Sequence, residues 1–290
     1  PFQDAGGAPV IAPTDISVAT FNVRRFFDTR CDSRRCSGSN SYERMYSEAE
    51  FAAKAQQIAA GIMELNADIV LLQEVETELC MSTLLEMMDP NRYPIGILGE
   101  TGSSASLDVA TVGRGRFIEQ RSHIMRPIPK PNGTMTTFSR ELLEVHLDID
   151  GRRLIVFNAH FKAKTNDDPE RRYAEGAASR EIVLERVAEF PNALIIIGGD
   201  LNDTPGSAPI NALEGNGGLT RVASELGPDA ATYVWRSTAQ AIDHLYLVET
   251  PAGTYVEGSV RVVRSNQRGL AGSDHAGLVA TFQIRNQARD

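Results

Sequence analysis

The sequence is poor in cysteine, in positive charge and in long apolar stretches. Three cysteines in 290 residues exclude a disulfide-rich scaffold. The longest apolar runs have the length of strands, so we expect nothing that spans or inserts into a membrane. Lys and Arg number 29 against 38 Asp and Glu, for a net charge of −9. This charge argues against a protein coated in nucleic acid, but it does not exclude a nuclease, whose metal ligands are acidic.

Two of the cysteines predict a short disulfide. Cys31 and Cys36 lie in the polar loop TRCDSRRCSGSN, whereas Cys80 lies in a predicted helix. A bridge between the first two fits an exported protein, and two free thiols in a cytosolic loop are the alternative. Residues 1–14 are rich in Pro, Ala and Gly, as in a flexible lead left after removal of a targeting segment or after trimming. We therefore expect an extracellular or periplasmic protein.

Strand-like and helix-like segments alternate along the chain with no linker between them. Amphipathic helices are predicted over 48–66 and 168–190, and Asp150–Gly151 predicts a hairpin between two strands. Further strands are predicted over 15–23, 67–76, 194–197, 241–249, 259–265 and 275–284. Mixed strands and helices indicate a layered α+β or α/β fold in a single domain over residues 15–285.

One stretch, ALIIIGGDLND, combines a buried strand with an acid. Leu194 to Ile197 form an unbroken apolar run, which predicts a strand buried on both faces. Asp200 and Asn202 follow it directly, and both residue types are also common in plain turns. A buried ionised carboxylate is costly unless it is paired or binds a cation, so the other strand ends decide between these interpretations.

Other predicted strands end in the same way. Polar residues of this kind stand at strand ends throughout the chain: Asn22, Glu74, Asn158, His160, Lys162, Asp243, Asp274 and His275. Together they predict one convergent site. Oxygen ligands without clustered thiols favour a hard divalent cation, Mg²⁺ first and Mn²⁺ or Ca²⁺ next. Such a cation with histidines and amides is typical of chemistry at phosphoryl oxygens.

These motifs, in this order, resemble the endonuclease/exonuclease/phosphatase superfamily, whose members include DNase I and secreted bacterial proteins. The matching segments are TFNV, LLQEVE, FNAHFKAK, GGDLND, AIDHLYL and GSDH, spread from residue 16 to about 283. The resemblance implies an α+β fold, a four-layer αββα sandwich with the site at one edge of two packed sheets. It also implies Glu74 as the principal metal ligand, Asn22 close to it, and Asp274 on the same or a second ion.

The resemblance also implies roles for the remaining matched residues. Asp200 would activate the attacking water, and Asn202 would hold the phosphate and help to place that water. His160 and His275 would contact phosphate oxygens in the transition state. Asp243 would orient the ring of His275 through a hydrogen bond. Whether Asp200 or His275 is the general base is left open by the sequence.

Substrate contacts beyond the motifs are predicted from the residue types alone. Arg140, Lys162 and Asn158 are candidates for contacts to substrate phosphate, because Arg offers two donors and Lys a point charge. Lys162 shares the face of His160 and is preferred to Lys164.

Four other polar residues are expected to have no catalytic role. Gln73 and His244 are expected to be structural. His146 is expected on a solvated strand face, and Arg172 at an exposed helix start.

The prediction is a metal-dependent phosphoester hydrolase, a phosphodiesterase or nuclease acting on DNA or RNA as a monomer. One alternative is the same chemistry on a small phosphoester, which the net charge favours. A second alternative is a non-catalytic binding module with the same fold. The number of metal ions and the choice between endo- and exo-cleavage are not predicted.

Overall fold

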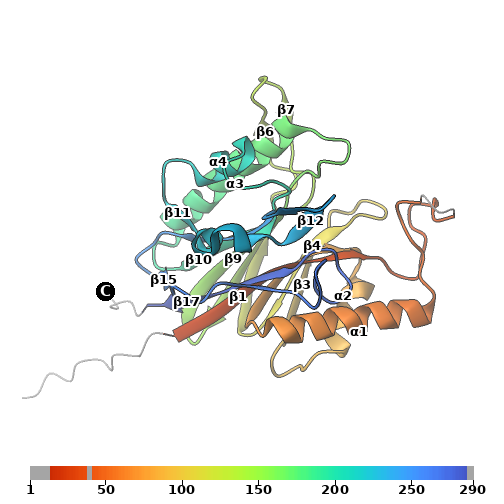
Figure 1. The fold of residues 1–290 in the computed structure, drawn as a ribbon. Helices are drawn as coiled ribbons and strands as arrows, with labels where there is room; N and C mark the ends of the chain where they lie inside the picture. The colour runs from red at the N-terminus through yellow and green to blue at the C-terminus, as the bar shows by residue number, and fades with distance from the viewer. Residues whose placement is uncertain (1–13, 38–40, 286–290) are drawn as a thin grey trace, which may run out of the picture.

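Two β-sheets packed face to face make up the centre of the molecule (Figure 1). The computed structural model describes residues 14–37 and 41–285. The predicted flexible lead lies outside them except for Thr14, which begins β1. Sheet A has the strand order β15-β17-β1-β2-β4-β3, with β16 paired to β17. Its strands are β1 (Thr14–Phe26), β2 (Ile69–Val75), β3 (Ile95–Gly99), β4 (Asp108–Gly113), β15 (Gly253–Tyr255), β16 (Arg261–Val263) and β17 (Gly277–Ile284).

Sheet B is built from the middle of the chain. Its strand order is β11-β14-β10-β9-β8-β5. Its strands are β5 (Arg116–Arg121), β8 (Leu143–Ile149), β9 (Arg152–His160), β10 (Leu194–Asp200), β11 (Leu219–Arg221) and β14 (Asp243–Val248). Two short hairpins pair β6 (Ile128–Pro129) with β7 (Met135–Thr136) and β12 (Tyr233–Trp235) with β13 (Thr238–Gln240), and a 3₁₀ segment spans Val222–Ala230. The chain thus returns to sheet A only after sheet B is complete.

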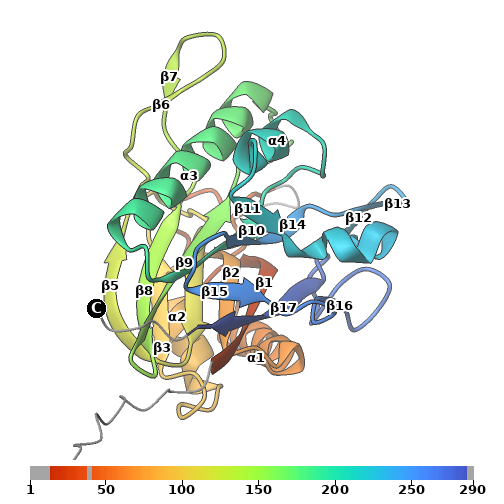
Figure 2. The ribbon, with the colours of Figure 1, turned by 90° about the vertical axis from the view of Figure 1, so that its left-hand side faces the viewer.

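Helices cover the outer faces of both sheets (Figure 2). They are α1 (Glu48–Leu65) and α2 (Glu78–Glu86) on sheet A, and α3 (Pro169–Glu189) and α4 (Ala208–Glu214) on sheet B. Three buried apolar clusters separate the layers: one between the sheets and one under each helix pair. The predicted αββα sandwich is therefore confirmed. None of the described helices has the length and apolar character needed to cross a membrane.

The register of sheet B places three site residues side by side. β10 runs parallel to β9 and antiparallel to β14, so Asp200 is paired with His160 on one side and with Asp243 on the other. Gly199 precedes this rung with a φ of 144°, and a Cβ there would lie 1.8 Å from the carbonyl oxygen of Ala159. Only glycine permits this approach, which explains the glycine before the acid.

A bulge in β2 moves Glu74 off the sheet face that regular strand alternation would give it. Val70 and Leu72 pack under the helices, and regular alternation would place Glu74 with them. The register between β2 and β4 shifts between Gln73 and Val75, and Glu74 has a φ of 69°. The bulge redirects its side chain to the end of the sandwich. Gln73 stays between the sheets and is fully buried, which agrees with the structural role expected for it.

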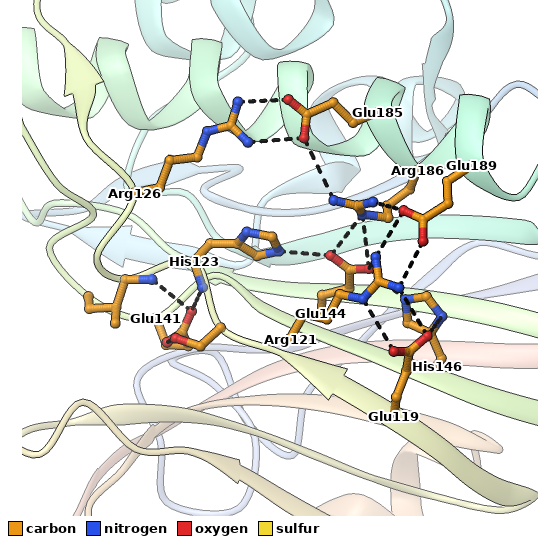
Figure 3. Close-up of polar contacts among 12 residues, drawn as sticks. Glu119, Arg121, His123, Arg126, Glu141, Glu144, His146, Glu185, Arg186 and Glu189 are labelled. Atoms are coloured by element: carbon orange, nitrogen blue, oxygen red, sulfur yellow. Dashed lines mark hydrogen bonds and ion pairs between the residues drawn. The ribbon is translucent and has the colours of Figure 1, made fainter.

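A buried ionic cluster lies under the C-terminal end of α3 (Figure 3). Glu144 is fully buried and is bonded to His123 (Nε2–Oε2 2.8 Å), His146 (Nε2–Oε1 2.5 Å) and Arg186. The ring of Phe190 packs edge-on against His146, 5.1 Å between centroids. The predicted solvated position of His146 is therefore wrong, because the last turn of α3 covers this face of β8.

We expect Glu144→Gln to destabilise the fold. Burial alone would raise the pKa of Glu144, but hydrogen bonds from His123 and His146 and the charge of Arg186 lower it to about 2. The substitution removes the fully buried counter-charge of Arg186, which the more exposed Glu189 replaces only in part, a loss of about 3 kcal/mol at neutral pH. Because the pKa is lowered on folding, this stabilisation is present above the ordinary value of 4.5 and fades as pH falls toward 2. Urea unfolding at pH 7 and pH 3 checks this. An equal gap between variant and parent at both pH values would contradict the assignment.

The predicted disulfide is present. Cys31 and Cys36 are bonded, in the segment between β1 and α1. The buried carboxylate of Glu43 accepts hydrogen bonds from the backbone N–H groups of Asp32 (2.6 Å) and Ser33 (2.7 Å), so the bridged loop is attached to the fold.

We expect reduction of this bridge to lower the thermal stability of the protein. Closing a loop of this length restricts the unfolded chain by about 2 kcal/mol, which corresponds to a melting temperature lower by several degrees after reduction. Calorimetry with and without dithiothreitol measures it. The Cys31→Ser/Cys36→Ser variant is the control, since dithiothreitol should not change its melting temperature. If dithiothreitol does not change the melting temperature of the parent either, the expectation is wrong.

Candidate active site

Most of the predicted catalytic and metal-binding residues meet in one pocket at the end of the sandwich where β1, β9 and β10 finish. The pocket has a volume of about 580 Å³. Six of the predicted residues line it: Glu74, His160, Asp200, Asn202, Asp274 and His275. They come from both sheets and from the loops that leave them, so the two sheets must be packed for the pocket to exist.

Asp200 lies at the centre of this group. Asn22, from sheet A, donates through Nδ2 to Asp200 Oδ2 at 3.0 Å, a hydrogen bond that crosses from one sheet to the other. The backbone N–H of Asn202 donates to Asp200 Oδ1 at 2.9 Å. The Nε2 atoms of His160 and His275 lie 3.6 and 3.9 Å from Asp200 Oδ2. The carboxylate thus stands between two imidazole rings.

His275 is oriented by Asp243, as the sequence predicts. Asp243 Oδ2 lies 2.9 Å from His275 Nδ1 and accepts a hydrogen bond from the Thr232 hydroxyl at 2.6 Å. The ring of Tyr233 packs on the imidazole with 4.7 Å between centroids. These contacts hold the ring with Nε2 toward Asp200 and the pocket.

The charges around the pocket shift three pKa values. Burial would lower the pKa of His275, but the charge and hydrogen bond of Asp243, with Asp200 and Asp274, raise it to about 10. Burial, with the charge of Asp243, raises the pKa of Asp200 to about 7. Burial, with Arg140 and His275 nearby, holds the pKa of His160 well below its usual value. At neutral pH His275 is therefore a cation and His160 is neutral.

Glu74 and Asp274 offer oxygen atoms suited to a hard divalent cation. Glu74 Oε1 accepts from Asn22 Nδ2 at 3.3 Å, and Glu74 Oε2 accepts from the backbone N–H of Arg25 at 2.8 Å. Asp274 lines the same pocket, with 35% of its side chain exposed. Two carboxylates without a thiolate fit Mg²⁺, Mn²⁺ or Ca²⁺. The oxygen of Asn22 already accepts from the N–H of Arg24 (2.9 Å), so this side chain holds Glu74 in place.

A second group of possible ligand atoms has another explanation. Asp200, Asp243 and His275 have ligand-type atoms within 4.8 Å of one another. The hydrogen bond between His275 Nδ1 and Asp243 Oδ2 already joins two of these residues, and all three are buried. We interpret this group as an acid–histidine pair beside a buried carboxylate.

A family model described as Endonuclease/Exonuclease/phosphatase family matches residues 19–275. The chain belongs to this family. The match spans every segment that carries the pocket, from the end of β1 to His275. It confirms the resemblance read from the six motifs, while the narrower resemblance to secreted bacterial members stays a prediction. Among curated proteins, comparison finds no match to this chain.

Solved structures of similar proteins share the fold. TDP2 from Caenorhabditis elegans is 18% identical with a TM-score of 0.63, over 93% of this chain and 74% of that one. The human Nocturnin catalytic domain with bound sulfate is 17% identical with a TM-score of 0.63, over 93% and 94%. Danio rerio TDP2 complexed with a single-stranded DNA product is 18% identical with a TM-score of 0.60, over 93% and 99%. At these identities the likeness establishes the αββα fold of the family.

Three predicted phosphate contacts lie elsewhere in this family member. Asn158 is fully buried between the sheets, where it accepts from Gln73 Nε2 at 2.8 Å and donates to two backbone carbonyls. Lys162 Nζ donates to the carbonyl oxygens of its own loop, at residues 163 and 165. Arg140 donates to the carbonyl oxygen of Phe161 at 3.1 Å. None of the three is among the residues that line the pocket.

The loop that follows β10 is fixed by a buried ion pair. Asn202 has a φ of 54° and donates through Nδ2 to the carbonyl of Phe161 at 3.1 Å. Next to it, Asp203 accepts from Arg172 Nε (2.9 Å) and from Lys164 Nζ (3.0 Å). Arg172 is only 3% exposed, so the prediction of an exposed residue is wrong. Lys164 rather than Lys162 reaches the pocket.

Sequence reasoning missed the cations and aromatic rings at the rim. Arg24 and Arg25 line the pocket, and so do Tyr233 and Trp235. Trp235 is 54% exposed, on the hairpin of β12 and β13. The sole tryptophan of the chain, placed just before the AIDHLYL motif, was the available signal. The two arginines follow Asn22 within the first matched segment, and their role depends on a bend in β1 that sequence alone does not reveal.

Proposed function

We propose that this protein is a metal-dependent phosphodiesterase that cleaves nucleic-acid backbones. The observation that carries the proposal is the composition of the pocket: buried Asp200 between two histidines, two carboxylates for a cation, and exposed Trp235 at the rim. Charged groups stabilise the phosphate in the transition state of its transfer. An exposed aromatic ring can stack on a nucleobase. Among the similar structures, Danio rerio TDP2 holds a single-stranded DNA product, which supports this substrate class.

The geometry favours Asp200 as the general base. Its pKa of about 7 matches the task of taking a proton from water near neutral pH. His275, held cationic by Asp243, donates through Nε2 to a phosphate oxygen and stabilises the negative charge of the transition state. His160, neutral and 3.6 Å from Asp200, donates a second hydrogen bond to the same phosphate. Asn202, in the loop that follows β10, would hold the phosphate through the Nδ2 hydrogen that is not donated to Phe161.

Glu74 and Asp274 would hold the divalent cation, for which Mg²⁺ is our first candidate. When bound, the cation supplies a positive charge that neutralises the phosphate oxygens. Asn22 keeps Glu74 directed at the pocket through the hydrogen bond at 3.3 Å. We further propose that the protein acts in an oxidising compartment, because the bridge between Cys31 and Cys36 is of the kind that exported proteins carry.

Three substrates compared side by side test the proposal: bis-p-nitrophenyl phosphate, p-nitrophenyl phosphate and supercoiled plasmid. We expect EDTA to stop the reaction, Mg²⁺ or Mn²⁺ to restore it, and the plasmid to be nicked. Nicking should decline steeply with added salt, because nucleic-acid binding releases counterions. Hydrolysis of the small esters with intact plasmid would replace the nuclease by an enzyme for small phosphoesters. No hydrolysis of any substrate, with metal bound, would favour a binding module.

A further inference from the structure

A second pocket adjoins the catalytic one and shares Arg24 and Arg25 with it. It also has a volume of about 580 Å³ and lies between the β1–α1 segment and the first turns of α1. We call it the arginine pocket, lined chiefly by Arg24, Arg25, Tyr42, Arg44, Tyr46 and Lys54. Figure 1 shows this segment extending past the sheets at the end of the sandwich where β12 lies.

The arginine pocket is positive in a protein that is negative overall. Residues 24–44 contain six arginines and three acids, against a net charge of −9 for the whole chain. Two of the acids, Asp28 and Glu43, are buried and accept backbone hydrogen bonds. Arg30, Arg34 and Arg35 are exposed beside the disulfide. Asp32 in this segment and Glu50 in the pocket wall are exposed acids, so guanidinium groups outnumber the exposed carboxylates here, and these are the groups best suited to phosphate.

Aromatic rings alternate with these cations. Tyr42 is 50% exposed, and the guanidinium of Arg25 lies 5.6 Å from its ring centroid. The guanidinium of Arg44 lies 4.7 Å from the ring centroid of Tyr46. Cations along a groove with exposed rings between them are the arrangement by which proteins bind single-stranded nucleic acid, phosphates on the cations and bases on the rings.

The backbone of Arg24 and Arg25 connects the arginine pocket to Glu74, the proposed metal ligand. Both residues have left-handed φ values, 56° and 50°. Such values are costly outside glycine and persist where neighbours enforce them. Here the N–H of Arg24 donates to Asn22 Oδ1 (2.9 Å), and that of Arg25 donates to Glu74 Oε2 (2.8 Å). The residues that place Glu74 thus also place the arginines between the two pockets.

Lys54 adds a fixed cation to the inner wall of the arginine pocket. It rises from α1, and its Nζ donates to the carbonyl oxygen of Val23 at 2.7 Å. An ammonium group has three donors, so two are free for another acceptor. The ammonium group lies near Arg24, and its hydrogen bond to Val23 keeps it in a fixed position.

We propose that the arginine pocket binds the nucleotide next to the scissile phosphate of a single-stranded nucleic acid. The neighbouring phosphate would lie on Arg44 and Lys54, and its base on the exposed ring of Tyr42. Arg24 and Arg25 would bridge the two phosphates. The inference rests on the proposed function for the identity of the substrate, but binding tests it without any catalysis.

Binding is measured in EDTA, by fluorescence anisotropy of a labelled 12-nucleotide single strand. We expect Arg44→Ala to raise the Kd about fivefold and to reduce the slope of log K against log salt by about 0.7, the value for one lost phosphate contact. Tyr42→Ala should raise the Kd about tenfold with little change in the slope, because it removes stacking and no charge.

Arg116→Ala is the matched control for Arg44→Ala. Each arginine is exposed and pairs with one acid at 2.6 Å, Glu50 for Arg44 and Asp148 for Arg116, but Arg116 lies on β5. Equal Kd values for the two variants and the parent would overturn the proposal. Binding to vesicles of 7:3 phosphatidylcholine and phosphatidylserine, with none to the oligonucleotide, would overturn it in favour of a membrane surface.

Kinetics separate this proposal from the proposed function. For Arg44→Ala, the ratio of kcat/KM on the oligonucleotide to kcat/KM on bis-p-nitrophenyl phosphate should fall about fivefold relative to the parent and to Arg116→Ala. If the parent is inactive but still binds the oligonucleotide through Arg44, the proposed function is wrong and the arginine pocket stands. If the parent is active but Arg44→Ala leaves the ratio of the two kcat/KM values unchanged, the arginine-pocket proposal is wrong and the proposed function stands.

Discussion

Replacing Glu74 by Gln is expected to lower kcat on bis-p-nitrophenyl phosphate by about a thousandfold and to leave the fold intact. The amide keeps the size of the side chain, and its oxygen can still accept one of the two hydrogen bonds, from Asn22 or from Arg25, that hold Glu74 now. It removes the negative charge that a divalent cation requires. Loss of about 4 kcal/mol of transition-state stabilisation corresponds to this factor.

The measurement combines kinetics with metal binding. Calorimetric titration with Mn²⁺ should give a weaker Kd for Glu74→Gln than for the parent, and the melting temperature without metal should change by a few degrees at most. Glu86→Gln is the control, because Glu86 is an exposed carboxylate on α2. Near-parent activity of Glu74→Gln would remove Glu74 as the principal ligand.

Replacing Asp243 by Asn is expected to lower kcat by about a thousandfold at pH 8 and by less at pH 6. Asp243 orients His275 through the 2.9 Å hydrogen bond and is the main cause that raises the pKa of that imidazole. Without the carboxylate the pKa of His275 falls from about 10 toward its ordinary value of 6.5. The cationic form, which stabilises phosphate charge, is then lost as pH rises through this lower value.

The pH profile of kcat/KM distinguishes this role from a merely structural one. The alkaline limb of the profile should move to lower pH in Asp243→Asn. Thr232→Val provides the control, because it removes a hydrogen bond to Asp243 Oδ2 and keeps the charge on the carboxylate. It should slow turnover modestly without moving the limb. An alkaline limb that does not move in Asp243→Asn would mean that His275 does not act as a cation.

Strand periodicity predicted the parts of the site that depend on regular backbone. The apolar run before Asp200 identified a strand buried on both faces, because residues 195 and 197 pack under the helices while Ile196 packs between the sheets. Alternation from Leu247 through Leu245 also placed Asp243 on the inner face. The family motifs supplied the order of these segments, and the register of β9, β10 and β14 brought their ends together.

The predictions were wrong for residues whose position or environment depends on tertiary contacts or on irregular backbone. Glu74 reaches the pocket only because of the bulge at its own position, which leaves no mark in the apolar pattern. His146 looked solvated because the end of α3 that covers it lies about forty residues further along the chain. Asn158 shares a strand face with His160, but it lies one pair of residues deeper, where hydrogen bonds between the sheets satisfy it.

The hydrogen bond between Asn22 and Asp200 makes the rate of the reaction depend on how the two sheets are packed against each other. One partner belongs to sheet A, the other to sheet B, and the proposed base takes its position from both. A displacement of one sheet on the other would therefore silence the enzyme before either sheet lost its own ladder of hydrogen bonds. Far-ultraviolet circular dichroism would not register such a state. On gradual heating, turnover should accordingly disappear no later than secondary structure, and the interval between the two losses measures how firmly the sandwich is closed.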